Sequence, residues 1–383
     1  MTITNTDFLA NDRAGIVFQR NVGFVTIRDN YFRNSGEDQD LDMEPSGGPE
    51  DRGPYEVDID LNLFERLQPK SAVALGAGGG VQPSRGVRFT SNTIRAVASE
   101  PPQPGGCIGV YLADQVTIAN NTVIGAPGCI TVSAQKVMNL RIENNHLESY
   151  VNLMDQGGRF DPRGVIDIRE RVVNRGDTRI YGDRPKPPCP YFIHYPDGVT
   201  ITGNKLIQHV QYAPGITVSN GDHLVLADNA LIATQEIVPS GSVVSTARAI
   251  GIDLPFGVAD SRSYGYYENE KREFSQWAVT GNSLLDFVDG LHLAPVKATV
   301  RLSAAALSGN VFDTHLQTPR GIFLQGPATA PQDAFITSLA VNKNRFGCGF
   351  SALLPEVLPP HAYVRPSGQT HTGNIGVTIP CQP

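Results

Sequence analysis

The sequence has little of what marks helical, membrane-spanning, nucleic-acid-binding or disulfide-rich proteins. Its 383 residues include only 4 Met and 1 Trp, and no apolar run approaches the length of a membrane span. Lys and Arg number 31 against 38 Asp and Glu, without a basic run, so nothing favours binding to nucleic acid. Five cysteines, an odd number in a long chain, exclude a disulfide scaffold. The first residues also show no signal peptide.

Glycine and proline are abundant instead. The chain has 39 Gly and 28 Pro, about one residue in six, and in a helix interior each would cost about 1–3 kcal/mol. Long helices are therefore excluded. Val, Ile, Leu and Phe recur throughout and the net charge is only −7, which argues against disorder. The composition predicts a β-rich chain with many turns.

A six-residue phrase, apolar-x-x-Asn-x-apolar, returns along the chain. Its asparagines are Asn30, Asn62, Asn92, Asn121, Asn145, Asn204, Asn229, Asn282, Asn310, Asn344 and, in a degenerate copy, Asn374. Most successive pairs are 24 to 34 residues apart, but two gaps of 59 and 53 residues are doubled. Each doubled gap holds either a degenerate repeat or a long loop.

The phrase has a direct structural interpretation. Alternating apolar residues before the asparagine predict a short strand with one face turned inward. Asparagine tolerates the left-handed backbone of a corner, and its amide can bond to an asparagine stacked above it. A second strand follows each corner, as in CIGVYL and GITVSN. Because one such unit cannot bury its apolar face alone, similar coils must stack, which predicts a parallel β-helix.

The V-T-I-x-x-N-x-I phrase resembles the repeats of pectate-lyase-like proteins over nearly the whole chain. The resemblance implies an all-β fold: a single-stranded right-handed parallel β-helix, or solenoid, of about a dozen coils. Residues 1–383 would form one domain with long insertions at 149–197 and 234–276. The family includes lyases, hydrolases and epimerases of polysaccharides, together with tailspikes and adhesins. Neither a Gly-His-Gly phrase with paired aspartates nor an Asp-Pro-His phrase is present, so no subfamily is indicated.

The N-terminal residues already look like a repeat. The segment Ile3–Phe8 places Thr6 at the asparagine position, which leaves no room for an N-terminal capping helix. We therefore expect either a truncated chain or an open edge covered by a partner, as a homo-oligomer or with a separate N-terminal segment. A secreted or cell-surface location is expected for such a protein.

Asp253 and His292 are the leading catalytic candidates. Aligning GIDL with GLHL places Gly251 over Gly290 and Asp253 over His292. Stacked strands lie about 4.8 Å apart, so the carboxylate and the imidazole would touch. An aspartate that orients a histidine is typical of a general base near neutral pH. The alternative is an ordinary surface pair at a coil edge.

Asp167 and Arg169 alternate outward from a strand in the first doubled gap. Asp167 would be two coils from Asp253, at the upper edge of the separation used in inverting hydrolysis. Arg169 could neutralise a substrate carboxylate, as elimination from a uronic acid requires. Tyr111 would contact the substrate. The alternative is a surface Asp/Arg pair.

The two insertions are rich in aromatic residues, which are suited to stacking on sugar rings. The proposed substrate contacts there are Tyr191, Tyr195, Tyr266 and, just after the second insertion, Trp277. The alternative is that these segments pack against a partner subunit.

An acidic run suggests a calcium site. Leu41 and Met43 would point inward and leave Asp40, Asp42 and Glu44 in one outward row, and Ca²⁺ takes six to eight oxygen ligands. The next strand would form a second such row with Glu56, Asp58 and Asp60. Lyases of the resembled family often use calcium. The alternative is a solvated acidic face.

Cys107 and Cys129 each precede an aligned isoleucine, so they should stack on adjacent coils. A Cα separation of about 4.8 Å permits either a disulfide or a pair of thiols.

Together these features predict a polysaccharide lyase or glycoside hydrolase acting on an acidic glycan that contains uronic acid. His292 would be the base, Asp253 its orienting partner and Asp167 a second carboxylate. The alternative is a non-catalytic β-helix that binds glycan or serves a structural role, such as a segment of a tailspike or surface adhesin.

Overall fold

The computed structural model describes residues 1–11, 14–33, 39–43, 50–66, 72–76, 82–96, 107–125, 129–133, 137–149, 164–169, 171–174, 191–209, 214–219, 221–234, 248–254, 273–287, 289–295, 301–313, 320–324, 339–347 and 370–372. All the regular elements within these ranges are β-strands. No helix in the described ranges has the length and hydrophobicity needed to cross a membrane.

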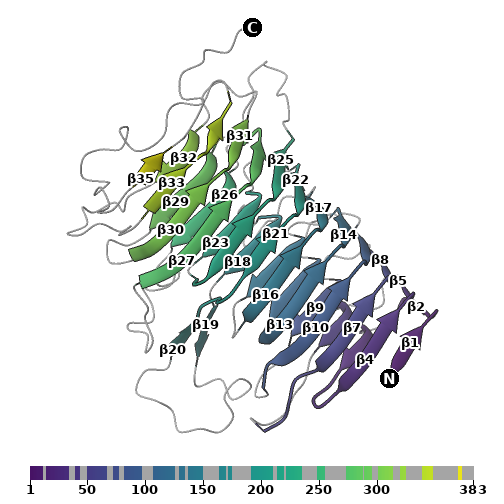
Figure 1. Cartoon of the computed structure of the whole chain (residues 1–383). Helices are drawn as coiled ribbons and strands as arrows, with labels where there is room; N and C mark the ends of the chain where they lie inside the picture. The colour runs from purple at the N-terminus through teal and green to yellow at the C-terminus, as the bar shows by residue number, and fades with distance from the viewer. Residues whose placement is uncertain are drawn as a thin grey trace.

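Three long parallel sheets form the molecule, named here sheets A, B and C (Figure 1). Sheet A has 12 strands: β1 (Thr2–Thr4), β4 (Gly23–Arg28), β7 (Tyr55–Asp60), β10 (Ser84–Thr90), β13 (Ala113–Ala119), β16 (Met138–Glu143), β21 (Thr200–Thr202), β24 (Leu224–Ala227), β27 (Glu273–Thr280), β30 (Arg301–Ser308), β33 (Leu339–Asn342) and β35 (Thr370–Thr372).

Sheet B has 11 strands: β2 (Asp7–Leu9), β5 (Tyr31–Arg33), β8 (Leu63–Arg66), β11 (Thr93–Ala96), β14 (Thr122–Ile124), β17 (His146–Ser149), β22 (Lys205–Gln208), β25 (Ala230–Ala233), β28 (Ser283–Leu285), β31 (Val311–Asp313) and β34 (Arg345–Phe346). Sheet C has 10 strands: β3 (Ala14–Phe18), β6 (Gln39–Met43), β9 (Val73–Gly76), β12 (Ile108–Tyr111), β15 (Ile130–Ser133), β18 (Ile166–Arg169), β23 (Ile216–Ser219), β26 (Arg248–Leu254), β29 (Asp289–Pro295) and β32 (Arg320–Leu324).

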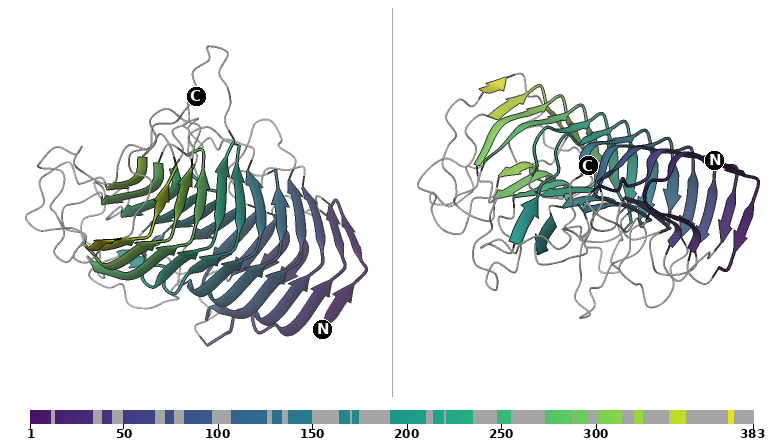
Figure 2. Two further views of the ribbon diagram at one scale, coloured as in Figure 1. Left: turned by 45° about the horizontal axis from the view of Figure 1, so that its top comes forward. Right: turned by 90° about the horizontal axis from the view of Figure 1, so that it is seen from below.

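The chain passes from sheet A to sheet B to sheet C and then starts the next coil. Every strand in the three sheets pairs in parallel with the equivalent strand of the neighbouring coil, and the coils follow one another in chain order (Figure 2). Parallel crossover connections are right-handed in nearly all proteins. The fold is a right-handed parallel β-helix, which confirms the fold predicted from the repeat.

Both doubled gaps are single coils with long connections. The Asn145 side chain donates directly to Asn204 Oδ1 at 2.9 Å, and Asn229 donates to Asn282 Oδ1 at 2.9 Å. No additional coil therefore lies between them. The first gap also contains an antiparallel hairpin, β19 (Arg171–Asn174) with β20 (Tyr191–His194). Each of the two insertions proposed from the sequence thus includes one regular strand of sheet C, β18 or β26.

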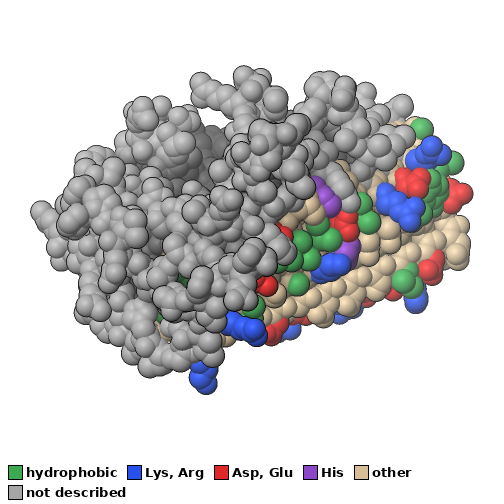
Figure 3. Space-filling view, turned by 90° about the horizontal axis from the view of Figure 1, so that it is seen from above, with side chains coloured by type: hydrophobic (Ala, Val, Ile, Leu, Met, Phe, Trp, Pro, Cys, Tyr) green, Lys and Arg blue, Asp and Glu red, His purple; other side chains and the backbone are tan. Residues whose placement is uncertain are grey.

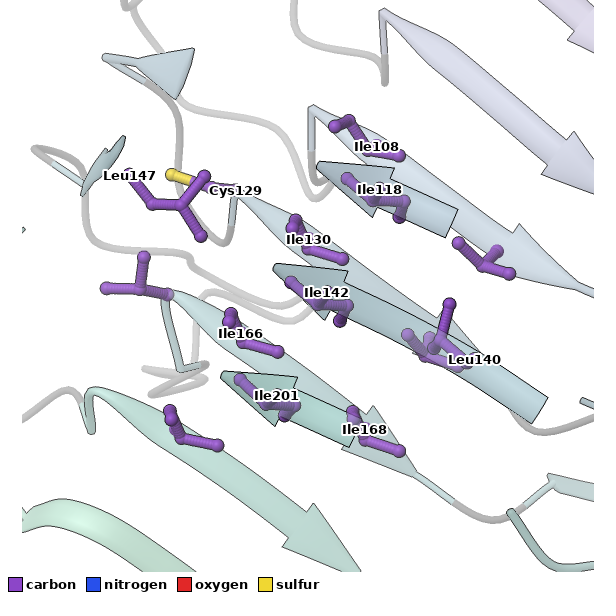
Figure 4. Packing of buried hydrophobic residues seen from close by; sticks show 14 of the residues in the cluster. Ile108, Ile118, Cys129, Ile130, Leu140, Ile142, Leu147, Ile166, Ile168 and Ile201 are labelled. Carbon is purple, nitrogen blue, oxygen red and sulfur yellow. The ribbon is translucent and has the colours of Figure 1, made fainter. Parts of the chain in front are cut away.

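The core lies between the three sheets and consists of alternate residues of each strand. Ile108, Ile130 and Ile166 follow one another on adjacent strands of sheet C, opposite isoleucines of sheet A (Figure 4). At the N-terminal end the rings of Phe8 and Phe32 stack with their centroids 4.6 Å apart. Because each coil buries its apolar face only against its neighbours, stability depends on the stack as a whole.

The repeated asparagines form a buried ladder along the inside of the corner. Each side-chain amide donates to the Oδ1 of the next asparagine and to a backbone carbonyl, as Asn62 does to Asn92 and to the carbonyl of Ile27. The left-handed backbone belongs to the residue before the asparagine, for example Leu61 with φ of 57° and Gly203 with φ of 66°. The expectation that asparagine itself turns the corner was wrong, because its side chain must face inward to reach the ladder.

Thr6 occupies the ladder position of the first coil. Its backbone N–H donates to Asn30 Oδ1 at 3.1 Å, and Asn5 before it has the left-handed φ of 52° found at the other corners. The interpretation of Ile3–Phe8 as a repeat is confirmed.

Cys107 and Cys129 lie on adjacent coils, because Ile108 pairs in register with Ile130. Both are buried, and neither forms a disulfide. The Cys129 thiol donates to the carbonyl of Glu148 at 3.4 Å. Burial raises the pKa of the Cys129 thiol well above its ordinary value, and the nearby Cys107 and Glu148 add to that shift. The structure therefore selects the stacked thiols over the disulfide.

This raised pKa predicts that the folded state weakens at alkaline pH. The unfolded thiol ionises above about pH 8.5, whereas the folded thiol stays protonated. Its contribution is therefore complete at neutral pH and is lost as the pH rises. The loss should reach about 1.4 kcal/mol per pH unit. Urea unfolding at pH 7.5, 9 and 10 should show a steeper decline for the wild type than for Cys129→Ala. Parallel declines would contradict the assignment.

Candidate functional site

In sheet C the described residues near the middle of the strands are buried on both faces from β6 onward, although Val17 of β3 is exposed. Val73, Ala74, Leu75 and Gly76 of β9 are all buried, whereas β7 of sheet A alternates between buried and partly exposed residues. Alternation with an exposed outer face is typical of a sheet that has solvent on one side. From β6 onward, the described outward side chains in the middle of sheet C are therefore withdrawn from solvent.

One outward row crosses sheet C at the same register position on successive strands, and we call it the outward rung. Its members from β6 to β29 are Asp42, Ala74, Gly109, Thr131, Asp167, Thr217, Gly251 and His292. Neighbouring members lie about 4.8 Å apart along the stack. The rung thus joins the predicted acidic run to the predicted catalytic residues.

The polar centre of the rung consists of Asp167, Thr217 and His292. Asp167 and His292 are each 1% exposed and Thr217 is 7% exposed. The hydroxyl Oγ1 of Thr217 is buried and has no hydrogen-bond partner among the residues described. An unsatisfied buried hydroxyl costs about 1–3 kcal/mol, so it points to a missing partner. Gly251 has no side chain to fill the rung between Thr217 and His292.

Long connections precede and follow both β18 and β26. Strand β18 is preceded by residues 150–165 after β17, and residues 175–190 separate the strands of the hairpin that follows it. Strand β26 lies between residues 234–247 and 255–272. Loops on a rigid scaffold are where binding residues concentrate. The connections therefore mark β18, β23 and β26 as the part of sheet C most suited to a site.

The predicted pairing of Asp253 with His292 was wrong. Gly251 is in register with His292, and Asp253 is in register with Ala294. The core residues Ile250 and Leu291 pair across the two strands, two positions away from the alignment expected from the sequence. A shift of two residues leaves the same side chains facing inward, so the hydrophobic pattern alone could not distinguish the two registers.

A second outward row lies two residues further along the strands. Arg169 is in register with Ser133, and Asp253 is in register with Ser219. Tyr111 follows Val110, which pairs with Val132, and so reaches the same row beside Ser133. Tyr111 is partly buried. Tyr111, Arg169 and Asp253 thus share one row on alternate strands of sheet C, two residues along the strand from the row of Asp167 and His292.

The four predicted aromatic contacts do not form one group. Trp277 lies in the core, 2% exposed, and its Nε1 donates to the carbonyl of Gly221 at 2.7 Å. Its role is packing, so the expectation of a sugar contact was wrong for this residue. Tyr195 packs against the core and is partly buried. Tyr191 begins β20 of the hairpin, and Tyr266 lies outside the described residues.

The acidic run is only partly described. Leu41 and Met43 are buried in the core, so Asp40 and Asp42 point outward as expected. Glu44 lies outside the described residues. Over the described ranges no group of three or more His, Cys, Asp or Glu side chains is arranged to hold a metal ion. The calcium site stays a prediction.

The second predicted row of carboxylates lies on a different sheet from the first. Glu56, Asp58 and Asp60 belong to β7 of sheet A. The guanidinium of Arg88 donates to both oxygens of Asp58, with Nη2 2.7 Å from Oδ2, and Arg28 lies 3.6 Å from Asp60. The expectation of a second outward row of carboxylates is therefore confirmed, and the two rows lie on different sheets.

Sequence reasoning missed a polar cluster on the outer face of sheet B. His146 and Glu148 of β17 and His209 after β22 lie together there. Figure 3 shows histidine side chains beside acidic and hydrophobic groups on this side of the molecule. The signal was present as His-x-Glu in the phrase around Asn145, two residues that share one face of a strand.

The fold and the outward rung define a right-handed parallel β-helix protein with a solvent-withdrawn polar row on one sheet. No family model matches the sequence, and no curated protein matches it. Among solved structures, the chain is similar to the surface adhesin PfbA of Streptococcus pneumoniae. The identity is 11% over 91% of this chain and 82% of that chain, with a TM-score of 0.39.

Two further solved structures are similar to it. One is the tailspike protein gp49 from the Acinetobacter baumannii bacteriophage Fri1, a capsular polysaccharide depolymerase. It is 9% identical over 98% of this chain and 64% of the tailspike, with a TM-score of 0.37. The other is DFA-IIIase from Arthrobacter chlorophenolicus A6, 11% identical over 82% of this chain and 83% of that one, with a TM-score of 0.30. The chain spans less than two thirds of the tailspike.

Proposed function

We propose that the protein acts on an acidic polysaccharide through the outward rung of sheet C. The observation that carries the proposal is the buried Thr217 hydroxyl, which has no partner in the described part of the chain. It lies between Asp167 and Gly251 on a row withdrawn from solvent. A sugar hydroxyl seated over Gly251 would supply the missing hydrogen bond.

The spacing of the rung suits a polymer. Asp167 and His292 are separated by three strand spacings, about 14 Å at the backbone. That is beyond the separation of about 6.5–9.5 Å used by a carboxylate pair that inverts one glycosidic bond. The two groups therefore act on different sugars of one chain that lies along the stack.

The roles follow from chemistry. His292 is the base: it takes the proton next to a sugar carboxylate in elimination, or the proton of the attacking water in hydrolysis. Asp167 accepts hydrogen bonds from hydroxyls of a neighbouring sugar. Arg169, on the second outward row, neutralises a uronate carboxylate there. Asp253 shares the row with Arg169 and binds substrate without touching His292.

A second candidate function is binding without turnover. Asp167 and His292 are each 1% exposed, and a polar row this deeply buried also suits a structural role within a β-helix. In that case the protein would bind glycan, or serve as a rigid segment, outside the cell or at its surface.

Product analysis separates the candidates. The protein is incubated with uronic-acid and neutral polysaccharides, with and without Ca²⁺, while unsaturated product and reducing ends are both followed. Unsaturated product identifies a lyase, and reducing ends alone identify a hydrolase. A requirement for Ca²⁺ would support the predicted site at Asp40 and Asp42. Absence of any product across the panel would overturn the catalytic proposal and leave the binding function.

A further inference from the structure

The outer face of sheet B contains a cluster of His146, Glu148 and His209. His146 Nε2 lies 2.6 Å from Glu148 Oε1, and His209 Nε2 lies 3.7 Å from Glu148 Oε2. On its other side the His209 ring is anchored, with Nδ1 3.0 Å from Thr234 Oγ1. All three side chains are partly buried, with Glu148 the least exposed. One carboxylate is thus shared by two imidazoles from neighbouring coils.

This geometry fixes the tautomer of His146. In the neutral ring one nitrogen carries the proton, and the carboxylate of Glu148 accepts only from a protonated nitrogen. Nε2 therefore holds the proton and Nδ1 carries the lone pair. Nδ1 has no hydrogen-bond partner in the portion of the chain that the structure describes. His146 consequently presents an oriented acceptor on the sheet surface.

A cation stands beside this acceptor. Lys205 of β22 is in register with His146, at a distance of about 4.8 Å between strands. Lys205 is exposed. Within the described ranges no carboxylate forms an ion pair with it. Lysine provides a point charge for an anionic group. An acceptor and a cation thus lie side by side on one row.

The next row of the sheet is apolar on both sides of Glu148. It consists of Ile124, Glu148, Ile207, Ile232 and Leu285, in register on five successive strands. The four apolar residues are partly exposed. A carboxylate in such a row requires compensation, which the hydrogen bond with His146 supplies.

A second histidine–carboxylate pair, His223 with Asp197 on sheet A, shows what distinguishes the cluster on sheet B. Its ring Nδ1 lies 2.7 Å from Asp197 Oδ1, and both side chains are 52% exposed. Asp197 precedes β21 and His223 precedes β24, both at the start of sheet A, and no row of isoleucines is in register with them among the described residues. Both sheets A and B therefore have a histidine–carboxylate pair. The cluster on sheet B differs because Lys205 and the row of Ile124, Ile207, Ile232 and Leu285 lie beside it.

We propose that this face of sheet B is a binding site for a uronic acid residue. The Lys205 ammonium pairs with the sugar carboxylate, His146 Nδ1 accepts a hydrogen bond from a ring hydroxyl, and the C–H face of the ring lies on Ile124 and Ile207. Glu148 is a positioning residue that holds the His146 tautomer. The site is separate from the outward rung and adds a second contact surface for the acidic glycan of the proposed function.

The test is NMR of the ¹⁵N-labelled histidine rings of the full chain, with His146 assigned by His146→Gln. Trimers of galacturonate and of glucuronate are titrated against neutral cellotriose. A uronate trimer should shift the His146 Nδ1 resonance, and cellotriose should not. Lys205→Gln should weaken uronate binding by about tenfold, one lost charge-assisted contact. Glu148→Gln should change the ring tautomer in the absence of sugar.

His223→Gln is the matched control and should leave the affinity within about twofold. The proposal is overturned if uronates bind Lys205→Gln as tightly as wild type, if cellotriose shifts His146 equally, or if neither uronate moves the resonance. Because the readout is binding at His146, a failure here is distinguishable from a failure of turnover at the outward rung.

Discussion

Replacing Asn204 by alanine is expected to lower the free energy of unfolding by about 3–6 kcal/mol. The Asn204 amide donates to Asn229 Oδ1 at 2.9 Å and to the carbonyl of Ile142 at 2.8 Å. Its Oδ1 accepts from both the backbone and the side chain of Asn145, each at 2.9 Å. Alanine would remove these bonds and leave buried partners on two other coils without compensation.

The measurement is denaturant unfolding followed by circular dichroism, with Thr202→Ala as the control. Thr202 lies two residues away on the outer face of β21, and its backbone carbonyl, which accepts from Asn204 at 3.1 Å, is unchanged by the substitution. The control should lose less than about 1 kcal/mol. Equal losses for the two variants would show that the ladder contributes no more than an ordinary surface residue.

His292→Gln is expected to reduce turnover by about 10²- to 10⁴-fold, on whichever glycan yields product. Glutamine retains hydrogen-bonding capacity and comparable volume at a site that is 1% exposed, but it cannot take up a proton near neutral pH. The fold should therefore survive while the base is lost. Initial rates of product formation measure the effect, and the thermal transition should stay within a few degrees of wild type.

The matched control for that variant is His223→Gln, which removes an exposed histidine paired with Asp197. Its rate should equal that of the wild type. Wild-type turnover in His292→Gln would exclude His292 as the base. A large fall in the temperature of the thermal transition would show that His292 stabilises the fold instead.

The asparagine spacing was sufficient to predict the coils. The repeated six-residue phrase combines a strand pattern with an asparagine whose side chain must hydrogen-bond to the asparagine of the next coil. The register of sheet C could not be predicted in the same way. The sequence alignment placed Asp253 over His292. The alternating apolar patterns of GIDL and GLHL match equally well when one is shifted by two residues, because side chains alternate between the faces of a strand with a period of two. In the structure Ile250 pairs with Leu291 and Ile252 with Leu293.

Two further misses have different causes. Trp277 lies inside β27, two residues before Val279 of the repeat phrase, and is in register with the core residue Leu224. Aligning the repeats would therefore have placed it inside. Its position next to a long insertion suggested a surface role instead. His146 and Glu148 were hidden within a phrase that predicts structure, and their partner His209 comes from another coil, which no local pattern reveals.

The hydrogen bonds of the asparagine ladder all point the same way. From Asn30 to Asn310, each side-chain amide donates to the asparagine of the following coil, so the amide dipoles add along the axis and can strengthen one another. The stack is therefore a polar rod with chemically distinct ends. Duplicating or deleting one whole coil would preserve this polarity, and two such rods could continue each other's ladder only head to tail.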